Sequence, residues 1–317
     1  MGRYQLILLF LIVILVLVGA WQVSISNDPD IITVGYIPCD HSAALFVAEA
    51  NNTYEKEGLN VKSTQLATGS DIISALSSGK LDVGYLGITP TLQAISQGVP
   101  IKIVGAVNLD GTGIVVQKNS KIQKIPDLEG KTVATPGVSS IQDILLLYEL
   151  QKYNMTSDDL NIVSMNIYVI PSALAADKID AYIAYEPFVS IARYRNTGQV
   201  MMYSGEIINN HPCCVIVARE DFIKEHPDEL QKFLKIHHTT TEYVKSHPED
   251  SAEMVSQEIV TNSKVEQMAM KNVIYVSLLD EKFQQSVIDF MIMENKLGYL
   301  NKTLTAEQLF DTRFLGG

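Results

Sequence analysis

The chain has 317 residues, of which 47% are hydrophobic, and it carries a formal net charge of −12 at neutral pH. This length is sufficient to bury a substantial core in one large or two modest domains. The acidic balance argues against a nucleic-acid-binding function, because that function needs a basic surface.

The first 26 residues indicate export. An unbroken apolar run from Leu6 to Val18 follows Arg3 and ends at the small residues Gly19 and Ala20. This pattern is typical of a secretory signal cleaved after Ala20. The alternative is an uncleaved membrane anchor, because 20 residues of helix span ~30 Å. In either case we expect the remainder to be extracytoplasmic, in a periplasm or at the cell surface.

From residue 31 onward, strand-like and helix-like patterns alternate. The first part predicts strands at 31–37, 60–67, 82–88 and 100–107, with helices at 41–58, 70–79 and 89–98. The second part predicts strands at 131–137, 181–187 and 213–218, and a helix at 139–154 that Ser140 and Asp143 begin as a capping box. From Arg219 the chain is expected to be mostly helical. Such alternation favours an α/β fold with parallel strands.

An internal repeat suggests two lobes. The segments "SALSSGKLDVGYLG" (74–87) and "SALAADKIDAYIAY" (172–185) share Ser-Ala-Leu, a Lys, an Asp and their apolar pattern. Each reads as a helix that leads into a strand. We therefore expect two similar α/β lobes with a cleft between them.

Five blocks of sequence resemble the nitrate/sulfonate/taurine-type substrate-binding proteins of ABC transporters. They are "GYIPCDHSAALFVAEANNTYEKEGLNV", "SALSSGKLDVGYLGITPTLQAISQGVPIKIV", "IPDLEGKTVATPGVSSIQDILL", "ALAADKIDAYIAYEPF" and "REDFIKEHPDELQKFLK". The resemblance implies a two-lobed periplasmic-binding-protein fold of type II, each lobe a mostly parallel sheet flanked by helices. Lobe one would comprise residues 31–113 and 215–315, and lobe two the inserted residues 114–214.

The function that the resemblance implies is capture of a small organic or sulfonate- or nitrate-like solute outside the cytoplasm. A monomeric binding protein would deliver that solute to an ABC permease and its ATPase, without a cofactor and without catalysis. Two alternatives stay open: an enzyme like the thiamine-pyrimidine synthases, which share the fold, and a membrane-tethered sensor domain.

The expected binding site lies at the strand ends. In open α/β sheets, ligands sit beyond the carboxyl ends of the strands, and several of these loops also begin helices whose free amides suit anions. The resemblance implies the same loops. The residues expected to bind the ligand are Pro38, Cys39, Asp40, His41, Gly69, Ser70, Gly87, Ile88, Thr89, Gly137, Ser139, Ser140, Tyr185, Glu186, His211, Cys213 and Cys214.

The cysteines and neighbouring histidines leave three interpretations open. The family topology would bring "HPCC" (211–214) close to "PCDH" (38–41). A cluster of Cys39, His41, His211, Cys213 and Cys214 could bind a soft or borderline metal. Cys39 could instead form a disulfide with Cys213 or Cys214, or all of them could line the pocket without further chemistry.

Overall fold

A computed structural model describes residues 31–259 and 261–314, and the predicted signal or anchor segment lies outside these ranges. Within the described ranges, no helix combines the length and apolar character needed to cross a bilayer.

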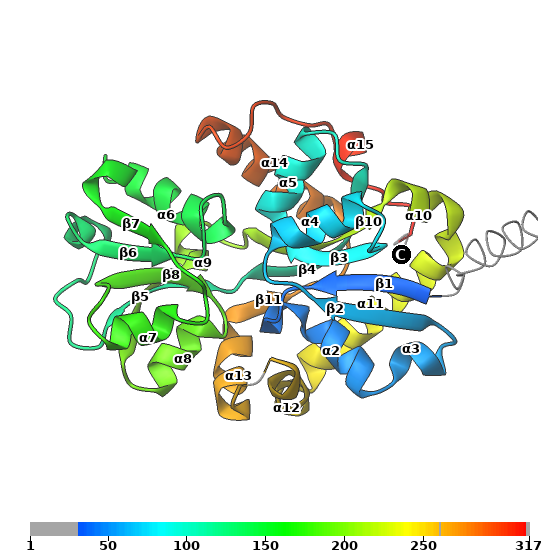
Figure 1. The fold of residues 1–317 in the computed structure, drawn as a ribbon, viewed down its shortest axis with the longest axis horizontal. Coiled ribbons are helices and arrows are strands. Elements are labelled where there is room, and N and C mark those ends of the chain that lie inside the picture. Colours follow the sequence, from blue (N-terminus) through cyan, green and yellow to red (C-terminus); the bar gives the residue numbers. More distant parts are fainter. Residues whose placement is uncertain (1–30, 260, 315–317) are drawn as a thin grey trace, which may run out of the picture. The chain divides into compact units, whose positions relative to one another are not determined.

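The strands form two sheets (Figure 1). The six-stranded sheet has the order β11-β4-β10-β3-β1-β2, and the five-stranded sheet has the order β7-β6-β8-β5-β9. The strands are β1 (Ile31–Tyr36), β2 (Asn60–Gln65), β3 (Val83–Gly87), β4 (Ile101–Asp110), β5 (Thr112–Gln117), β6 (Thr132–Thr135), β7 (Asn161–Ser164), β8 (Ala181–Tyr185), β9 (Gly198–Tyr203), β10 (Pro212–Arg219) and β11 (Val273–Tyr275).

Helices cover both sheets. The α-helices are α2 (Ala43–Ala50), α3 (Thr53–Lys56), α4 (Gly69–Ser77), α5 (Ile88–Ser96), α6 (Ile141–Gln151), α7 (Ile170–Ala175), α8 (Phe188–Tyr194), α9 (Ser204–Ile207), α10 (Glu220–Glu225), α11 (Pro227–Ser246), α12 (Pro248–Glu258), α13 (Ser263–Ala269), α14 (Glu281–Lys296) and α15 (Ala306–Leu309). Short 3₁₀ helices are η1 (Asp40–Ser42), η2 (Ile125–Leu128), η3 (Ser157–Asp159) and η4 (Met270–Asn272).

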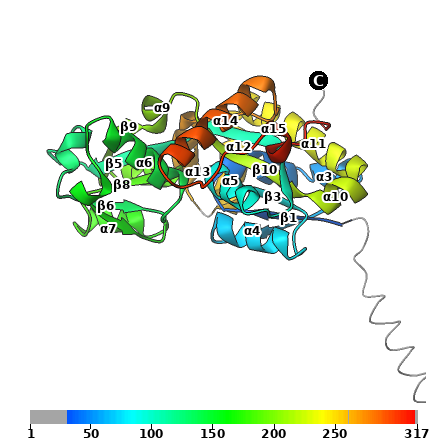
Figure 2. The same cartoon turned by 90° about the horizontal axis from the view of Figure 1, so that it is seen from above.

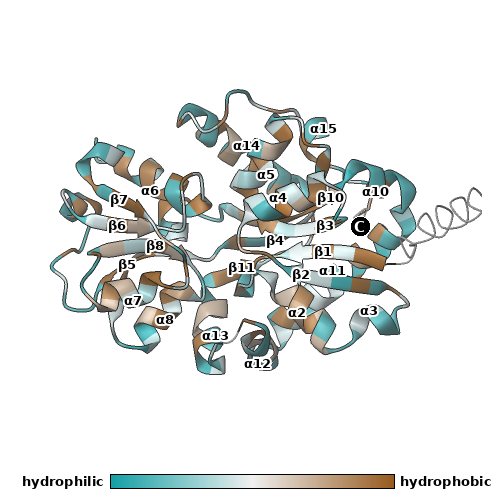
Figure 3. Cartoon of the chain, in the orientation of Figure 1, coloured by the Kyte–Doolittle hydropathy of each residue, from teal (hydrophilic) through white to brown (hydrophobic). Residues whose placement is uncertain are grey.

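Strand β10 shows how the first sheet is buried on both faces. Val215 and Val217 pack with α4, α5 and α14, whereas Ile216 and Ala218 pack with α2, α11 and α12. This division follows from the two-residue period of a strand, which places successive side chains on opposite faces. Figure 2 shows α14 beside α5, and Figure 3 shows that the covering helices carry both hydrophobic and hydrophilic residues.

Strand β8 repeats this arrangement in the second sheet. Ala181 and Ile183 belong to the cluster that contains α6, whereas Tyr182 and Ala184 pack against α7 and α8. The cluster that contains α6 also contains the residues of α4, α5 and α14, so one apolar core is continuous from the first sheet to the second.

The chain passes from the first sheet to the second at Gly111, between β4 and β5. It returns between Tyr203, the end of β9, and Pro212, the start of β10. The proposed lobe boundary at 113/114 falls after the second residue of β5, and the one at 214/215 falls after the third residue of β10. The assignment of lobes stays a prediction.

The predicted α/β fold class is confirmed, with differences in detail. Both sheets are mixed: β3 and β1 run parallel, but β10 runs antiparallel to both β3 and β4, and β5 antiparallel to β8 and β9. The helix expected at 41–58 is divided because Asn52 has a φ of +52°, a left-handed conformation that Asn tolerates. The repeated segments are α4 with β3 and α7 with β8.

Candidate functional site

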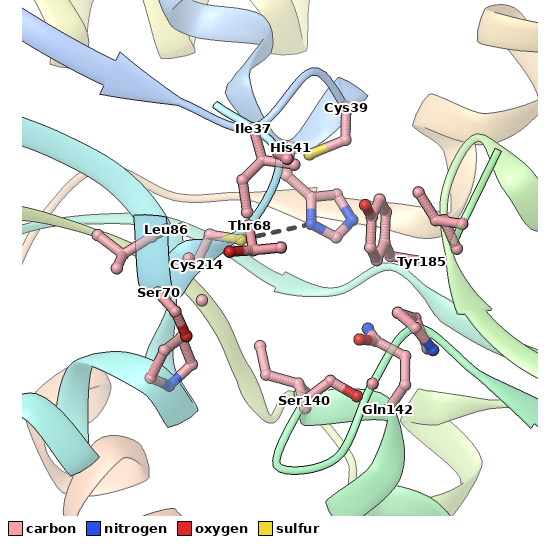
Figure 4. A pocket seen from close by; sticks show the side chains of 18 of the residues that line it. Ile37, Cys39, His41, Thr68, Ser70, Leu86, Ser140, Gln142, Tyr185 and Cys214 are labelled. Atoms are coloured by element: carbon pink, nitrogen blue, oxygen red, sulfur yellow. Dashed lines mark hydrogen bonds between the residues drawn. The ribbon is translucent and has the colours of Figure 1, made fainter. Parts of the chain in front are cut away.

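A cavity of about 320 Å³ lies at the carboxyl ends of strands from both sheets (Figure 4). Its walls come from β10 and from the ends of, or loops after, β1, β2, β3, β6, β7 and β8, as the general rule for α/β folds predicts. The lining residues are Ile37, Cys39, His41, Ser42, Ala67, Thr68, Gly69, Ser70, Tyr85, Leu86, Gly87, Pro90, Pro136, Gly137, Val138, Ser139, Ser140, Ile141, Gln142, Asn166, Ile167, Tyr168, Tyr185, Cys213 and Cys214.

Most of the sequence-predicted site residues are brought together in this lining. They are Cys39, His41, Gly69, Ser70, Gly87, Gly137, Ser139, Ser140, Tyr185, Cys213 and Cys214. Their role in binding a ligand stays a prediction.

Other predicted residues lie behind the cavity wall. Pro38 and Ile88 are not among the lining residues, although each adjoins one. Thr89 is buried, and its hydroxyl donates a hydrogen bond to Glu294 Oε1 at 2.5 Å. His211 lines a different cavity. Its Nδ1 lies 3.0 Å from the carbonyl oxygen of Pro212, and its ring stacks on Phe290.

The predicted acidic residues also lie outside the lining. Glu186 accepts hydrogen bonds from Ser190 and from the Asn272 amide, and burial raises the pKa of its carboxyl to about 7. Asp40 is fully buried, and burial raises its pKa well above the usual range. Neither of its carboxyl oxygens has a hydrogen-bond partner among the described residues, although Oδ1 lies 3.9 Å from His41 Nε2. These two carboxylates therefore lie behind the lining of the cavity, and their role in binding a ligand stays a prediction.

Sequence reasoning missed one wall of the cavity. The missed residues Asn166, Ile167 and Tyr168 follow β7. Because the sequence did not predict this strand, the strand-end rule did not select the loop after it. Gln142 was also missed, although its position two residues after Ser140, the N-cap of α6, placed it in the first helical turn.

Three helices begin at the cavity. The N-cap residues are Thr68 for α4, Gly87 for α5 and Ser140 for α6. The first amides of a helix have no partner inside it, and the helix dipole makes this end positive. Among the described residues that line the cavity there is no Arg, Lys, Asp or Glu. The positive potential at the cavity therefore comes mainly from backbone amides.

A cluster of two thiols and an imidazole forms part of the wall. His41 Nδ1 lies 3.5 Å from both Cys213 Sγ and Cys214 Sγ, and the two sulfurs are 3.9 Å apart. These ligand atoms lie within 4.8 Å of one another. We call His41, Cys213 and Cys214 the thiol–imidazole cluster. Neither Cys39 nor His211 belongs to it, so the structure brings together three of the five residues that the sequence left open as a metal cluster. All three cysteines are free thiols.

The cluster shares protons among its members. A hydrogen bond from Cys214 and the nearby His41 ring lower the pKa of the Cys213 thiol well below its usual range. Burial opposes protonation of His41, but Cys213, Asp40 and the Gly111 carbonyl together outweigh burial and raise the pKa of the ring to about 9. The hydrogen bond to Cys213 and burial raise the pKa of Cys214 well above its usual range. These directions favour a thiolate at Cys213, beside a protonated His41 ring and a neutral Cys214 thiol.

Comparison with known proteins shows that the chain is similar to solute-binding proteins. The sequence profile of a family described as NMT1/THI5 like matches residues 40–251. The chain belongs to this family. It is 25% identical over 270 residues to the "Putative aliphatic sulfonates-binding protein" of Bacillus subtilis, covering 83% of this chain and 80% of that protein.

The family also contains enzymes. The chain is 27% identical over 210 residues to the 4-amino-5-hydroxymethyl-2-methylpyrimidine phosphate synthase of Schizosaccharomyces pombe, covering 62% of this chain and 60% of that protein. Among solved structures, it superposes with a TM-score of 0.80 on the ligand-binding component of an ABC-type import system from Staphylococcus aureus with zinc bound. That protein shares 18% sequence identity, and the match covers 90% of this chain and 98% of the other, which shows the fold.

Proposed function

We propose that this protein is the extracytoplasmic solute-binding component of an ABC importer. The cavity would hold one small solute, and an ABC permease with its ATPase would receive it. The fold, the family and the sulfonate-binding relative support this assignment. We further propose that the chain is a monomer, that its N-terminal segment directs export or tethers it to the membrane, and that it does not convert its solute.

The solute that fits best is a small organic anion with an apolar part, of the alkanesulfonate type. The observation that carries this proposal is the convergence of the N-termini of α4, α5 and α6 on one cavity without a carboxylate in its lining. The amides would bind the anionic head group, as helix N-termini commonly do. Leu86, Ile141 and Tyr185 supply apolar surface for the organic part.

Solute capture would involve closure of two lobes. We retain residues 31–113 with 215–315 as lobe one and 114–214 as lobe two. The chain passes between the two sheets at Gly111 and between Tyr203 and Pro212, and a hinge can act at these two connections.

Thermal unfolding of the full-length protein in mild detergent tests the proposal with three probes of similar size. Ethanesulfonate is the anion, ethanesulfonamide the neutral control and ethylamine the cationic control. A bound anion at 100 times its Kd would stabilise the folded state by about 2.7 kcal/mol. We expect ethanesulfonate alone to raise the melting temperature and to be recovered unchanged. Stabilisation by the amide or amine alone would contradict the proposed solute class.

A second candidate is an enzyme of the pyrimidine synthase type. The pyrimidine synthase relative and the Cys213 thiolate in the cavity wall favour it, because a thiolate can act as a nucleophile. Mass spectrometry of the same incubations separates the two functions. A new product that accumulates with time would establish conversion and reject simple solute capture.

A further inference from the structure

We propose that His41, Cys213 and Cys214 together bind one zinc-type divalent metal ion, with a fourth coordination position open to the cavity. This site goes beyond solute capture, because it is defined by protein ligands and does not depend on which solute the cavity accepts.

The distances within the cluster fit a tetrahedral ion. Zinc lies about 2.3 Å from a thiolate sulfur and about 2.0 Å from an imidazole nitrogen. With the two sulfurs 3.9 Å apart, bonds of that length give an S–metal–S angle of about 116°. With Nδ1 3.5 Å from each sulfur, both N–metal–S angles are about 109°. These angles sum to less than a full circle, so the three ligands form a pyramid that leaves one tetrahedral position free.

The other nitrogen of His41 has the partner that a metal-binding histidine needs. Nε2 lies 3.3 Å from the carbonyl oxygen of Gly111, to which it donates a hydrogen bond, and 3.9 Å from Asp40 Oδ1. Such a bond holds the proton on Nε2 and directs the lone pair of Nδ1 at the metal. Neither carboxyl oxygen of Asp40 has a hydrogen-bond partner among the described residues, so this group is free to accept from the ring as well.

An irregularity in β10 aims both cysteines at the same point. Neighbouring residues of a regular strand point to opposite faces, so Cys213 and Cys214 could not both reach one ring. The pairing of β10 with β4 shifts register between Pro212 and Cys214 and again between Cys214 and Val215. Asn108 fixes this bulge, because its Oδ1 accepts a hydrogen bond from the Cys214 amide at 3.2 Å. Bulges of this kind re-aim side chains at functional sites.

The free coordination position opens into the solute cavity. All three residues of the cluster line it, and Cys214 is the least buried of them. Three protein ligands with an open position are typical of zinc sites that exchange a ligand, whereas structural sites have four. Water, or a donor atom of the solute, would complete the coordination.

Metal binding also sets the protonation of the ligands. Two thiolates and one neutral imidazole must face the ion, so a bound ion displaces whatever protons these three groups hold at those atoms. The bound centre, one divalent cation with two thiolates, has no net charge, which suits a buried position.

Cobalt(II) is the probe that tests the site, because thiolate-bound tetrahedral cobalt absorbs visible and near-ultraviolet light. The full-length protein in mild detergent is reduced with a phosphine, its three thiols are counted, and cobalt is titrated in. We expect one cobalt per chain, a sulfur-to-cobalt charge-transfer band and displacement by zinc. No charge-transfer band from protein with three free thiols would overturn the proposal.

Three variants and one matched control assign the ligands. Cys213→Ser, Cys214→Ser and His41→Gln should each weaken cobalt binding by more than the ~10–100-fold that loss of an outer-shell contact costs. Cys39→Ser is the control, because Cys39 lines the same cavity and stays outside the cluster. Melting curves without metal identify any variant that fails to fold. The two remaining cluster variants then test the ligand assignment. Equal loss in Cys39→Ser, or an unchanged spectrum in the cluster variants, would contradict the assignment.

Discussion

The carbonyl oxygen of Gly111 lies 3.3 Å from Nε2 of His41, although 70 residues separate them in sequence. Gly111 is also the point at which the chain leaves the first sheet for the second. The thiol–imidazole cluster is thus held by the segment that connects the two sheets.

Gly111→Ala should destabilise the protein more than Gly98→Ala. Both glycines have left-handed backbones, with φ of +87° and +86°, so a side chain at either costs about 1–2 kcal/mol. A Cβ at Gly98 meets nothing within 4 Å, whereas one at Gly111 would lie 2.5 Å from His41 Nε2. Displacing the ring would add about 1–3 kcal/mol through its lost hydrogen bond. Urea unfolding of both variants measures the difference, and equal midpoints would show that the ring adapts without cost.

Ser70→Pro should weaken solute binding while Ser70→Ala preserves it. Ser70 is the second residue of α4, and its amide has no partner inside the helix. Proline removes that amide and is tolerated in a first helical turn, whereas alanine removes only the hydroxyl. If the amide binds the solute, its loss should cost about 1.4 kcal/mol, or tenfold in Kd, by calorimetry. Equal loss in both variants would instead assign the recognition to the hydroxyl.

Glu294→Gln should remove part of the pH dependence of stability. Burial raises the pKa of Glu294 from 4.5 to about 8, although the hydrogen bond from Thr89 opposes this. Because the folded state favours the protonated form, the stabilisation is complete below pH 4.5 and is lost as pH rises through about 8. The loss amounts to at most about 5 kcal/mol. Glutamine is neutral at every pH and can still accept the bond from Thr89.

Urea unfolding at pH 5 and pH 9 measures this effect in both proteins. Wild type should lose more stability than Glu294→Gln over that range. Glu186 and Glu266, whose burial raises each pKa to about 7, retain a slope of the same sign in the variant. Identical pH slopes in the two proteins would show that Glu294 is not buried as described.

Phe233→Ala should be strongly destabilising. Phe233 is fully buried, stacks on Tyr54 at a centroid distance of 5.5 Å, and meets Tyr85 edge-on at 6.3 Å. Removing a buried Phe leaves a cavity and typically costs about 3–5 kcal/mol. Phe233→Leu fills most of that volume and should cost less than half as much in the same urea experiment. A small effect of the alanine variant would mean that α11 collapses into the space.

Local patterns were enough to predict the α/β alternation and most strand-end loops. The start of α6 is an example, because Ser140 accepts a hydrogen bond from the amide of Asp143 as the capping pattern indicates. Residues such as Ser70 and Cys39 therefore fall where the strand-end rule placed them. These features depend on spacing along the chain, which the sequence contains.

Features that depend on non-local pairing could not be predicted in this way. Strands β5, β7, β9 and β11 are short or are recognised only by their partners, so their loops were overlooked. The direction of a side chain near a bulge is equally hidden. Strict alternation along a strand would not have directed both Cys213 and Cys214 at the His41 ring. The sequence "HPCC" likewise does not indicate that His211 lines a different cavity.

The position of β10 has a consequence for biosynthesis. It pairs with both β3 and β4, yet roughly a hundred residues that build the other sheet are made between β4 and β10. During synthesis from the N-terminus, β3 and β4 therefore each keep an unpaired apolar edge until β10 has been made. Exposed edges of this kind invite pairing with other chains. Export of the unfolded chain would delay folding until the whole length is available, so that β10 can enter the gap at once.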